Sequence, residues 1–461
     1  MICSTTQTRL PQLPDAPFTS TQNACKLCTP LGACLAFAGI EGARTVLHGS
    51  QGCATYIRRY MISHFKEPID IASSNFGEQA AIFGGRENLR VSLQNVSKQY
   101  EPRLIGVATT CLSETIGDDV GMFLKEIERE TSAEGRPVVV PVSTPAYAGT
   151  HAEGFHAAVR AVIEQLAEPG EPGKHVNLFP GMCSPSDLRY LREVLEDFDL
   201  PTIVTPDYSD TLDGPTWDQY HLIPRGGTSI QQIQQTARAK ASIELSQTND
   251  ASRTAGCFLE EQHSVPRHRL PLPIGVAQTD ELFAVLERLT GQPTPEKHQM
   301  ERGRLIDSFV DGHKYLFDKR AVVFGEEDLV VGMAGLLAEI GMVPIVCASG
   351  GKSGKMQAAI EDLAPDLTSR VEVLQGVDFV EIEKLAEKLR PDLLIGHSKG
   401  YTMSRRLGIP LIRIGFPIHD RVGGARILHL GYRGTQQLFD RITNALIETT
   451  QADSSVGYTY M

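Results

Sequence analysis

Three cysteines, Cys28, Cys53 and Cys111, each lie in a short segment with the pattern of a turn between a strand and a helix. Thr29 is a favourable N-cap residue and Pro30 suits the first helical position, so Cys28 is predicted at a helix N-terminus. Cys53 follows a β-branched run and a glycine-containing turn, whereas Cys111 follows a buried-strand pattern and precedes an amphipathic stretch. The sequence therefore predicts one structural setting for all three thiols, within a chain that alternates strands and helices.

Thiols in this setting favour an iron–sulfur cluster. The positive end of a helix dipole stabilises a thiolate, and flanking glycines let the backbone approach bulky inorganic sulfide. Iron–sulfur clusters bind through such thiolates. The alternative is that each cysteine packs as a small buried hydrophobic residue, as free cysteines often do. Zinc is disfavoured, because Cys25 and Cys28 form one C-x-x-C pair with no second pair at finger spacing.

Length and charge narrow the class of protein. A chain of 461 residues exceeds one ordinary core and suggests about three domains. Its net charge of −12 argues against a general nucleic-acid binder, which would normally be basic. No apolar run approaches a membrane span, and the N-terminus lacks a signal-peptide pattern. We therefore expect a cytoplasmic protein without nucleic-acid or membrane partners, in which the nine cysteines are reduced.

The apolar runs alternate with helical patterns throughout, which predicts an α/β fold with βαβ units. Residues 1–23 are polar and aperiodic, and we expect them to form an N-terminal arm. A Pro/Gly-rich seam at 168–174 marks the first boundary. The expected domains are a cluster-binding domain at 24–168, a second α/β domain at 169–300, and a third at 301–461 that ends in a C-terminal helix.

Individual elements follow from the same patterns. Strands are expected at 45–47, 104–108, 138–142, 176–179, 202–204, 256–260, 321–324, 343–347, 371–374 and 392–395. Helices are expected at 119–130, 151–166, 186–196 and 228–245, and a helical section at 279–316 follows a Pro-rich crossing at 265–273.

Few other residues indicate chemistry. His48, beside the Cys53 turn, is the histidine that most favours a functional role, although histidines at strand ends more often hydrogen-bond the backbone. Asp118 and Asp119 are interpreted most simply as charges at a helix N-terminus. Neither a full dinucleotide-binding nor a Walker A spacing occurs, and no Ser/His/Asp or paired-carboxylate pattern favours hydrolysis.

Several motifs together resemble the β-subunit side of nitrogenase component 1, from about residue 23 to the C-terminus. They are Cys28-Thr-Pro-Leu-Gly-Ala, His48-Gly-Ser-Gln-Gly-Cys53, His64-Phe-Lys-Glu-Pro68, Ala80-Ala-Ile-Phe-Gly-Gly85, Thr109-Thr-Cys-Leu-Ser-Glu-Thr-Ile-Gly-Asp-Asp119, Thr144-Pro and Ile412-Arg-Ile-Gly-Phe-Pro417. The fold that this resemblance implies is three doubly wound parallel-sheet (Rossmann-like) domains.

The resemblance also implies a function. An α-like subunit would pair with this chain, as α2β2, and the interface would hold an eight-iron P-type cluster bound by Cys28, Cys53 and Cys111 together with residues of the partner. Phe83 would lie where an ATP-dependent iron protein with a 4Fe–4S cluster docks, and Tyr56 would lie between the P-type cluster and an active-site metallocluster in the partner. Electrons would pass along this route to the substrate.

Two departures from the family pattern matter. Catalytic molybdenum nitrogenases carry a serine that binds the oxidised P-cluster, and this chain has Ala146 at that place; the N-terminal arm is also shorter. An alternative nitrogenase, a nitrogenase-like reductase of the methylthio-alkane type and a cofactor-assembly scaffold all stay open. Scaffold chains of the β type usually read Thr-Thr-Gly where this chain has Cys111, which favours a working electron-transfer subunit.

Overall fold

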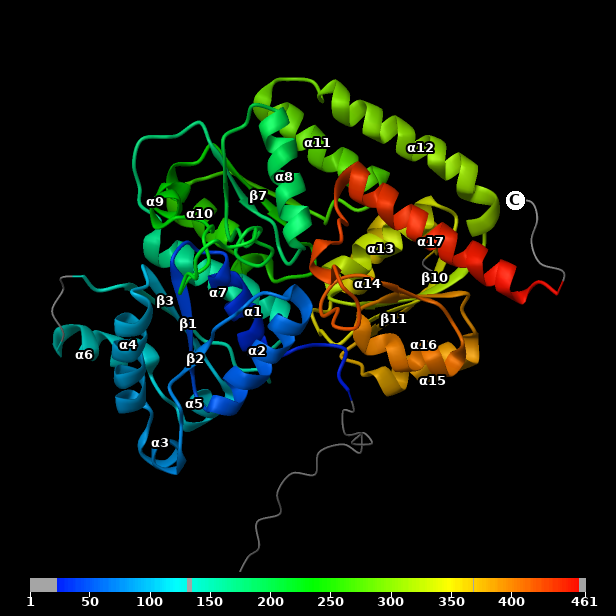
Figure 1. The fold of residues 1–461 in the computed structure, drawn as a ribbon. Coiled ribbons are helices and arrows are strands. Elements are labelled where there is room, and N and C mark those ends of the chain that lie inside the picture. Colours follow the sequence, from blue (N-terminus) through cyan, green and yellow to red (C-terminus); the bar gives the residue numbers. More distant parts are fainter. Residues whose placement is uncertain (1–22, 131–134, 368, 456–461) are drawn as a thin grey trace, which may run out of the picture.

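The fold contains three parallel sheets, each flanked by helices, that lie around a common centre (Figure 1). The computed structural model describes residues 23–130, 135–367 and 369–455. The predicted arm at 1–23 falls almost wholly outside these residues. Every pairing between neighbouring strands in the three sheets is parallel, which confirms the α/β prediction. The division into domains at the residues given above stays a prediction.

The first sheet has the strand order β2-β1-β3-β4. Its strands are β1 (Ala43–His48), β2 (Ala72–Ser73), β3 (Leu104–Thr109) and β4 (Val138–Val142). Alternate side chains of β1 and β3 face opposite ways. Val46 and Val107 pack on α4 (Arg86–Tyr100) and α6 (Val120–Glu130), whereas Leu47 and Leu104 join the core formed with α1 (Thr29–Ala38) and α7 (His151–Leu166). Helices thus cover both faces, as in doubly wound sheets.

Two further sheets repeat this architecture. The second has the order β6-β5-β7-β8, and the third has the order β11-β10-β9-β12-β13. The strands of the second are β5 (Val176–Phe179), β6 (Thr202–Val204), β7 (Ala241–Leu245) and β8 (Arg267–Leu270), with helices α8 (Pro185–Asp197), α9 (Ile230–Gln235) and α10 (Ala255–His263). The strands of the third are β9 (Arg320–Gly325), β10 (Val343–Ser349), β11 (Glu372–Gln375), β12 (Leu393–Gly396) and β13 (Leu411–Arg413), with helices α13 (Glu327–Glu339), α14 (Met356–Leu363), α15 (Phe379–Leu389) and α16 (Tyr401–Leu407).

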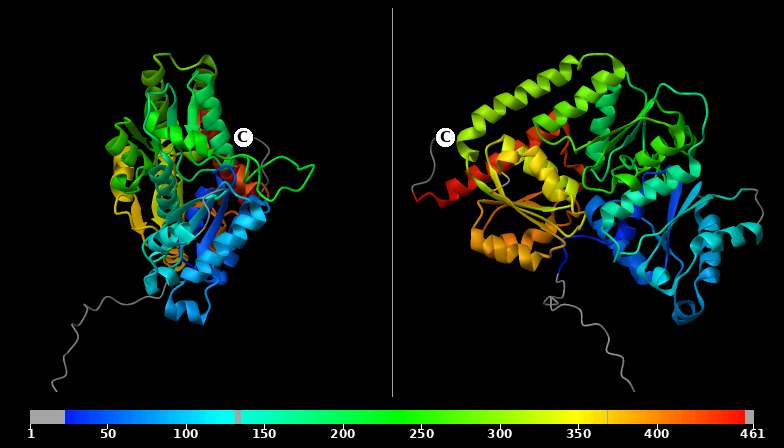
Figure 2. Two further views of the ribbon diagram at one scale, coloured as in Figure 1. Left: turned by 90° about the vertical axis from the view of Figure 1, so that its left-hand side faces the viewer. Right: turned by 180° about the vertical axis from the view of Figure 1, so that it is seen from behind.

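Long helices complete the fold. The helical section predicted at 279–316 consists of α11 (Val276–Thr290) and α12 (Glu296–Leu316), separated where Gly291 adopts a left-handed conformation and two prolines follow. The C-terminal helix is α17 (Gly431–Asp453), and it packs along α12, which runs along the outer edge of the molecule (Figure 2). Among the described residues, no helix has the length and apolarity needed to cross a membrane.

Two predictions in the second sheet are wrong. Of the helix predicted at 228–245, only residues 230–235 form the α-helix α9. Residues 241–245 instead form β7, the strand between β5 and β8. The strand predicted at 256–260 is instead the first part of α10, which Thr254 caps by accepting a hydrogen bond from the Cys257 amide. Short apolar runs do not distinguish a strand from a helix, so pairing within the sheet decides between them. The Pro-rich crossing likewise contains the edge strand β8.

In the first sheet, the chain adds β2 on one side of β1 and then β3 and β4 on the other side, so the strand order reverses between β1 and β3. These two strands are parallel, and their carboxyl ends lie next to each other. Ligands of doubly wound sheets bind outside the carboxyl ends of the strands at such a point. β1 and β3 lead into the helices α2 (Gln51–Phe65) and α5 (Cys111–Ile116). The two later cysteines therefore emerge at the switch point of the first sheet.

Candidate metal-cluster site

Cys28 is the N-cap residue of α1, one position before the predicted cap Thr29, and its side chain is mostly buried. Close packing of α1 against α7 fixes this end of the helix. A Cβ atom on Gly32 would lie 1.7 Å from the His151 carbonyl oxygen, so only glycine allows this approach. The Thr29 hydroxyl donates a hydrogen bond to the Pro145 carbonyl oxygen at 3.2 Å. Cys28 is thereby held beside the loop that carries Ala146.

Cys53 lies in the first turn of α2, directly after β1 and its glycine turn. Ser50 is the N-cap residue of this helix, and its hydroxyl lies 3.8 Å from the Cys53 sulfur. The helix N-terminus and this hydroxyl both place positive ends of dipoles near the sulfur.

Cys111 is the first residue of α5, and its side chain is exposed. Thr110 caps this helix in a capping box with Ser113. The backbone amide of Ala146 donates a hydrogen bond to the Cys111 sulfur at 3.2 Å. The residue at the position of the family's serine therefore contacts a predicted cluster ligand through its backbone.

The three sulfurs lie in one neighbourhood. Burial raises the pKa of Cys28, and the nearby Cys53 and Cys111 side chains raise this pKa further. Within the described residues, no group of three His, Cys, Asp or Glu side chains is compact enough to hold a single metal ion. Cysteine sulfurs are the ligands that iron–sulfur clusters take from proteins, and these three sulfurs lie at or near helix N-termini in one neighbourhood. The donor set therefore fits the predicted cluster.

The neighbourhood of the cysteines carries exposed aromatic side chains. Tyr147, next to Ala146, has 67% of its surface exposed, and Tyr56, three residues after Cys53 on α2, has 65% exposed. Phe83 is the last residue of the short helix α3 (Glu78–Phe83) and is 85% exposed. Exposed aromatic residues of this kind mark protein–protein contact surfaces. The predicted roles of Tyr56 and Phe83 need such exposure and stay predictions.

The structure corrects the interpretation of Asp118. Its carboxylate does not serve as a simple helix charge, because it accepts hydrogen bonds from the Gly85 amide and lies 3.1 Å from His48 Nε2. Asp119 alone caps α6, by accepting a hydrogen bond from the Met122 amide. His48 contacts side chains and not the backbone that strand-end histidines commonly use. Their separation of 70 residues in the chain left this pair without a sequence signal.

The remaining described cysteines are packing residues. Cys25 lies in the core of the third sheet with Val322 and Phe324, and burial raises its pKa to about 12. Burial also raises the pKa of each of four others, namely Cys34, Cys183, Cys257 and Cys347. Cys3 lies outside the described residues.

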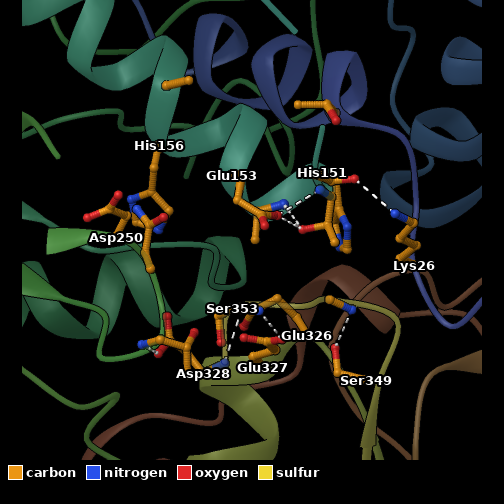
Figure 3. A pocket seen from close by; sticks show the side chains of 18 of the residues that line it. Lys26, His151, Glu153, His156, Asp250, Glu326, Glu327, Asp328, Ser349 and Ser353 are labelled. Atoms are coloured by element: carbon orange, nitrogen blue, oxygen red, sulfur yellow. Dashed lines mark hydrogen bonds between the residues drawn. The ribbon is translucent and has the colours of Figure 1, made fainter. Parts of the chain in front are cut away.

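A separate cavity of about 450 Å³ lies between the N-terminal ends of α7 and α13 (Figure 3). The carboxylates that line this cavity accept hydrogen bonds from the surrounding loops and helix ends. Asp328 accepts hydrogen bonds from the Ser246 hydroxyl and from the backbone amides of Gln247 and Thr248. Glu326 caps the N-terminus of α13. Glu153 accepts from the Thr150 amide. These carboxylates brace the loops that meet at the centre of the molecule.

The chain belongs to the family described as "Nitrogenase component 1 type Oxidoreductase", whose sequence profile matches residues 28–447. Similar proteins that align over nearly the whole chain are nitrogenase β chains, so the chain is a β-like subunit of a nitrogenase-type reductase that functions in a complex.

The relatives agree with this assignment. The chain is 35% identical to the nitrogenase molybdenum-iron protein beta chain of Clostridium pasteurianum over 94% of each chain. It is 35% identical to the nitrogenase vanadium-iron protein beta chain of Trichormus variabilis, over 91% of this chain and 92% of the other. The solved structure "Nitrogenase Cp1 at pH 6.5" matches with a TM-score of 0.93 and 32% identity, over 98% of this chain and 99% of the other. The predicted family and fold are therefore confirmed.

Proposed function

We propose that this chain relays electrons from an ATP-dependent iron protein, which carries a 4Fe–4S cluster, to a metallocofactor in an α-like partner subunit. Cys28, Cys53 and Cys111 bind an eight-iron P-type cluster, and residues of the partner complete its coordination within an α2β2 heterotetramer. The substrate, dinitrogen or a methylthio-alkane type compound, is reduced at the partner's cofactor. The complex works in the cytoplasm.

The observation that supports this proposal most strongly is that the three cysteine sulfurs lie near one another, beside the exposed side chains of Tyr56 and Tyr147. Each sulfur lies at or near a helix N-terminus, where unpaired backbone N–H groups face outward. Cys111 is exposed, so part of the sulfur set is accessible to a second chain. When bound, a P-type cluster supplies one-electron redox chemistry at low potential.

This chain's residues orient the sulfurs and extend the route for electrons. The Ala146 amide and the Ser50 hydroxyl support the Cys111 and Cys53 sulfurs, respectively. Tyr56 is about one helical turn from Cys53, so both side chains lie on the same side of α2. Phe83 supplies an apolar anchor for the iron protein, as large exposed aromatic residues do at interface hot spots.

A scaffold that assembles the cofactor without turning over a substrate is the competing function, favoured by Ala146 in place of the serine. Anaerobic purification with the α-like partner separates the two. A reductase complex contains iron and acid-labile sulfide, and consumes ATP and reductant when the iron protein and substrate are present. A scaffold complex instead transfers its metallocluster to an apo-enzyme and reduces no substrate. A complex without iron would refute both functions.

A further inference from the structure

His48 lies between the turns that carry two cluster cysteines and the corner that carries Phe83. It is the last residue of β1, and its ring has no exposed surface. Its Nδ1 is 3.1 Å from the Ser74 hydroxyl, and its Nε2 is 3.1 Å from an Asp118 carboxylate oxygen. The ring of Phe76 packs edge-on against it at 4.8 Å. The imidazole is therefore held from several sides in one orientation.

The hydrogen bonds through this ring form one continuous chain. The Gly49 amide donates to the Ser74 hydroxyl at 2.9 Å, and the Gly85 amide donates to Asp118 at 3.0 Å. Burial lowers the pKa of His48 although Asp118 raises it, so the ring is neutral and has one N–H. That N–H donates to the carboxylate, which leaves Nδ1 to accept from Ser74. Every bond from Gly49 to Gly85 then has a donor and an acceptor.

The carbonyl oxygen of His48 joins the second cysteine turn to this chain. It accepts hydrogen bonds from the Thr110 amide, the Thr110 hydroxyl at 3.1 Å and the Ser113 hydroxyl at 2.8 Å. A Cβ atom on Gly49 would lie 1.9 Å from the Thr110 hydroxyl. The turn before Cys53 and the residue before Cys111 are therefore in direct contact, and His48 holds both.

The other end of the chain reaches the exposed corner between α3 and α4. Gly85 follows Phe83 by two residues, and a Cβ atom on Gly85 would lie 2.1 Å from the Phe76 ring and 2.7 Å from Asp118. Tightly packed contacts of this kind transmit displacement, because the neighbours have no space to yield. A partner that pushes on Phe83 thus acts on Asp118 and His48.

We propose that His48 and Asp118 are positioning residues that couple occupation of the Phe83 corner to the geometry of the Cys53 and Cys111 turns. The inference rests on the proposed function, because it needs a cluster at these turns and an iron protein at Phe83. Docking then changes how the sulfurs are presented to the cluster. By reciprocity, the oxidation state of the cluster changes the affinity of the iron protein.

The test measures this coupling in the anaerobically purified complex. The dissociation constant of the iron protein, held with a non-hydrolysable ATP analogue, is measured with the P-type cluster reduced and again after oxidation by a mediator dye. The ratio of the two constants is the coupling, and it should be about 5 or more in the unmodified complex. His48→Leu removes both ring contacts, and Ser74→Ala removes one hydroxyl. In both variants the ratio should approach one.

Two controls separate coupling from general stability. Ser74→Thr keeps the hydroxyl and should keep the ratio. His298→Leu, on the distant helix α12, disrupts a matched buried histidine that contacts Glu301 on the same helix and Asp197 at the end of α8, and this variant should also keep the ratio (Figure 1). A ratio of one in the unmodified complex, or an unchanged ratio in Ser74→Ala, would overturn the inference. An unmodified complex that lacks iron or fails to bind the iron protein would instead refute the proposed function.

Discussion

The substitution Ala146→Ser tests the redox range of the proposed cluster. Ala146 already contacts Cys111 through its amide, so a serine side chain at this position starts next to a cluster ligand. An alkoxide is a harder donor than sulfide and favours more oxidised iron. The alanine methyl group supplies no such ligand. The oxidised cluster should therefore be easier to reach in Ala146→Ser than in the unmodified complex.

The loop should accept this serine without rearranging. Thr144 anchors it by hydrogen bonds to Thr109, through its amide at 2.8 Å and its hydroxyl at 2.7 Å. The Ala148 amide also donates to the Pro145 carbonyl oxygen at 3.0 Å. Ala146 is partly exposed, so the added hydroxyl is not forced into a closed core. The substitution should change the free energy of unfolding by about 0.5 kcal/mol or less.

The expected size follows from the strength of one charged contact. A hydrogen bond to a charged group contributes about 1.5–3 kcal/mol, and we take the same scale for the alkoxide contact. For a one-electron step, this corresponds to a midpoint potential lowered by roughly 60–130 mV. Because the serine must lose its proton to bind iron, the midpoint should also fall by about 59 mV for each unit rise in pH.

Redox titration followed by electron paramagnetic resonance measures both effects. Ala148→Ser, which places the same side chain in the same loop two residues away, is the matched control and should leave the midpoint unchanged. Identical midpoints, pH dependence and signals in Ala146→Ser and the unmodified complex would show that this position does not set the redox range of the cluster.

Three further predictions follow from the same geometry. Replacing Cys111 with alanine should lower the iron and acid-labile sulfide content, whereas Cys347→Ala should leave both nearly intact and cost stability only, about 1–3 kcal/mol. Phe83→Ala should leave the unfolding free energy within about 0.5 kcal/mol, since the ring is exposed, but should weaken iron-protein binding by roughly 2 kcal/mol in a titration; equal affinities would count against the docking role. Burial lowers the pKa of His64 in the folded chain to about 3, whereas the pKa of this histidine in the unfolded chain is about 6.5. Between these two values only the unfolded chain binds the proton, so the free energy of unfolding falls as the pH drops from about 6.5 towards 3. His64→Asn, which can still accept the Ile418 amide, should reduce this slope by about 1.4 kcal/mol per pH unit in urea unfolding, and an unchanged slope would contradict it.

Local patterns in the sequence determined most of the secondary structure. The strands at 104–108 and 138–142 and the helix at 151–166 were predictable because their apolar spacing and caps are local properties. The setting of the three cysteines was predictable for the same reason, since each follows from a short turn and its neighbours. Where the local signal was ambiguous, the prediction was wrong: residues 241–245 form a strand because they pair with β5 and β8, whereas residues 256–260, predicted as a strand, belong to helix α10.

Contacts between distant residues were decided only by the tertiary structure. The pairing of His48 with Asp118 depends on the order of strands in the first sheet, which brings the end of β1 beside the end of β3. The contact between Ala146 and Cys111 depends on the parallel register of β3 and β4. Neither has a local signature, because the residues that meet are about one strand–helix unit or more apart in the chain. The sequence thus predicts which residues carry the chemistry, and the packing of the sheets determined which residues touch.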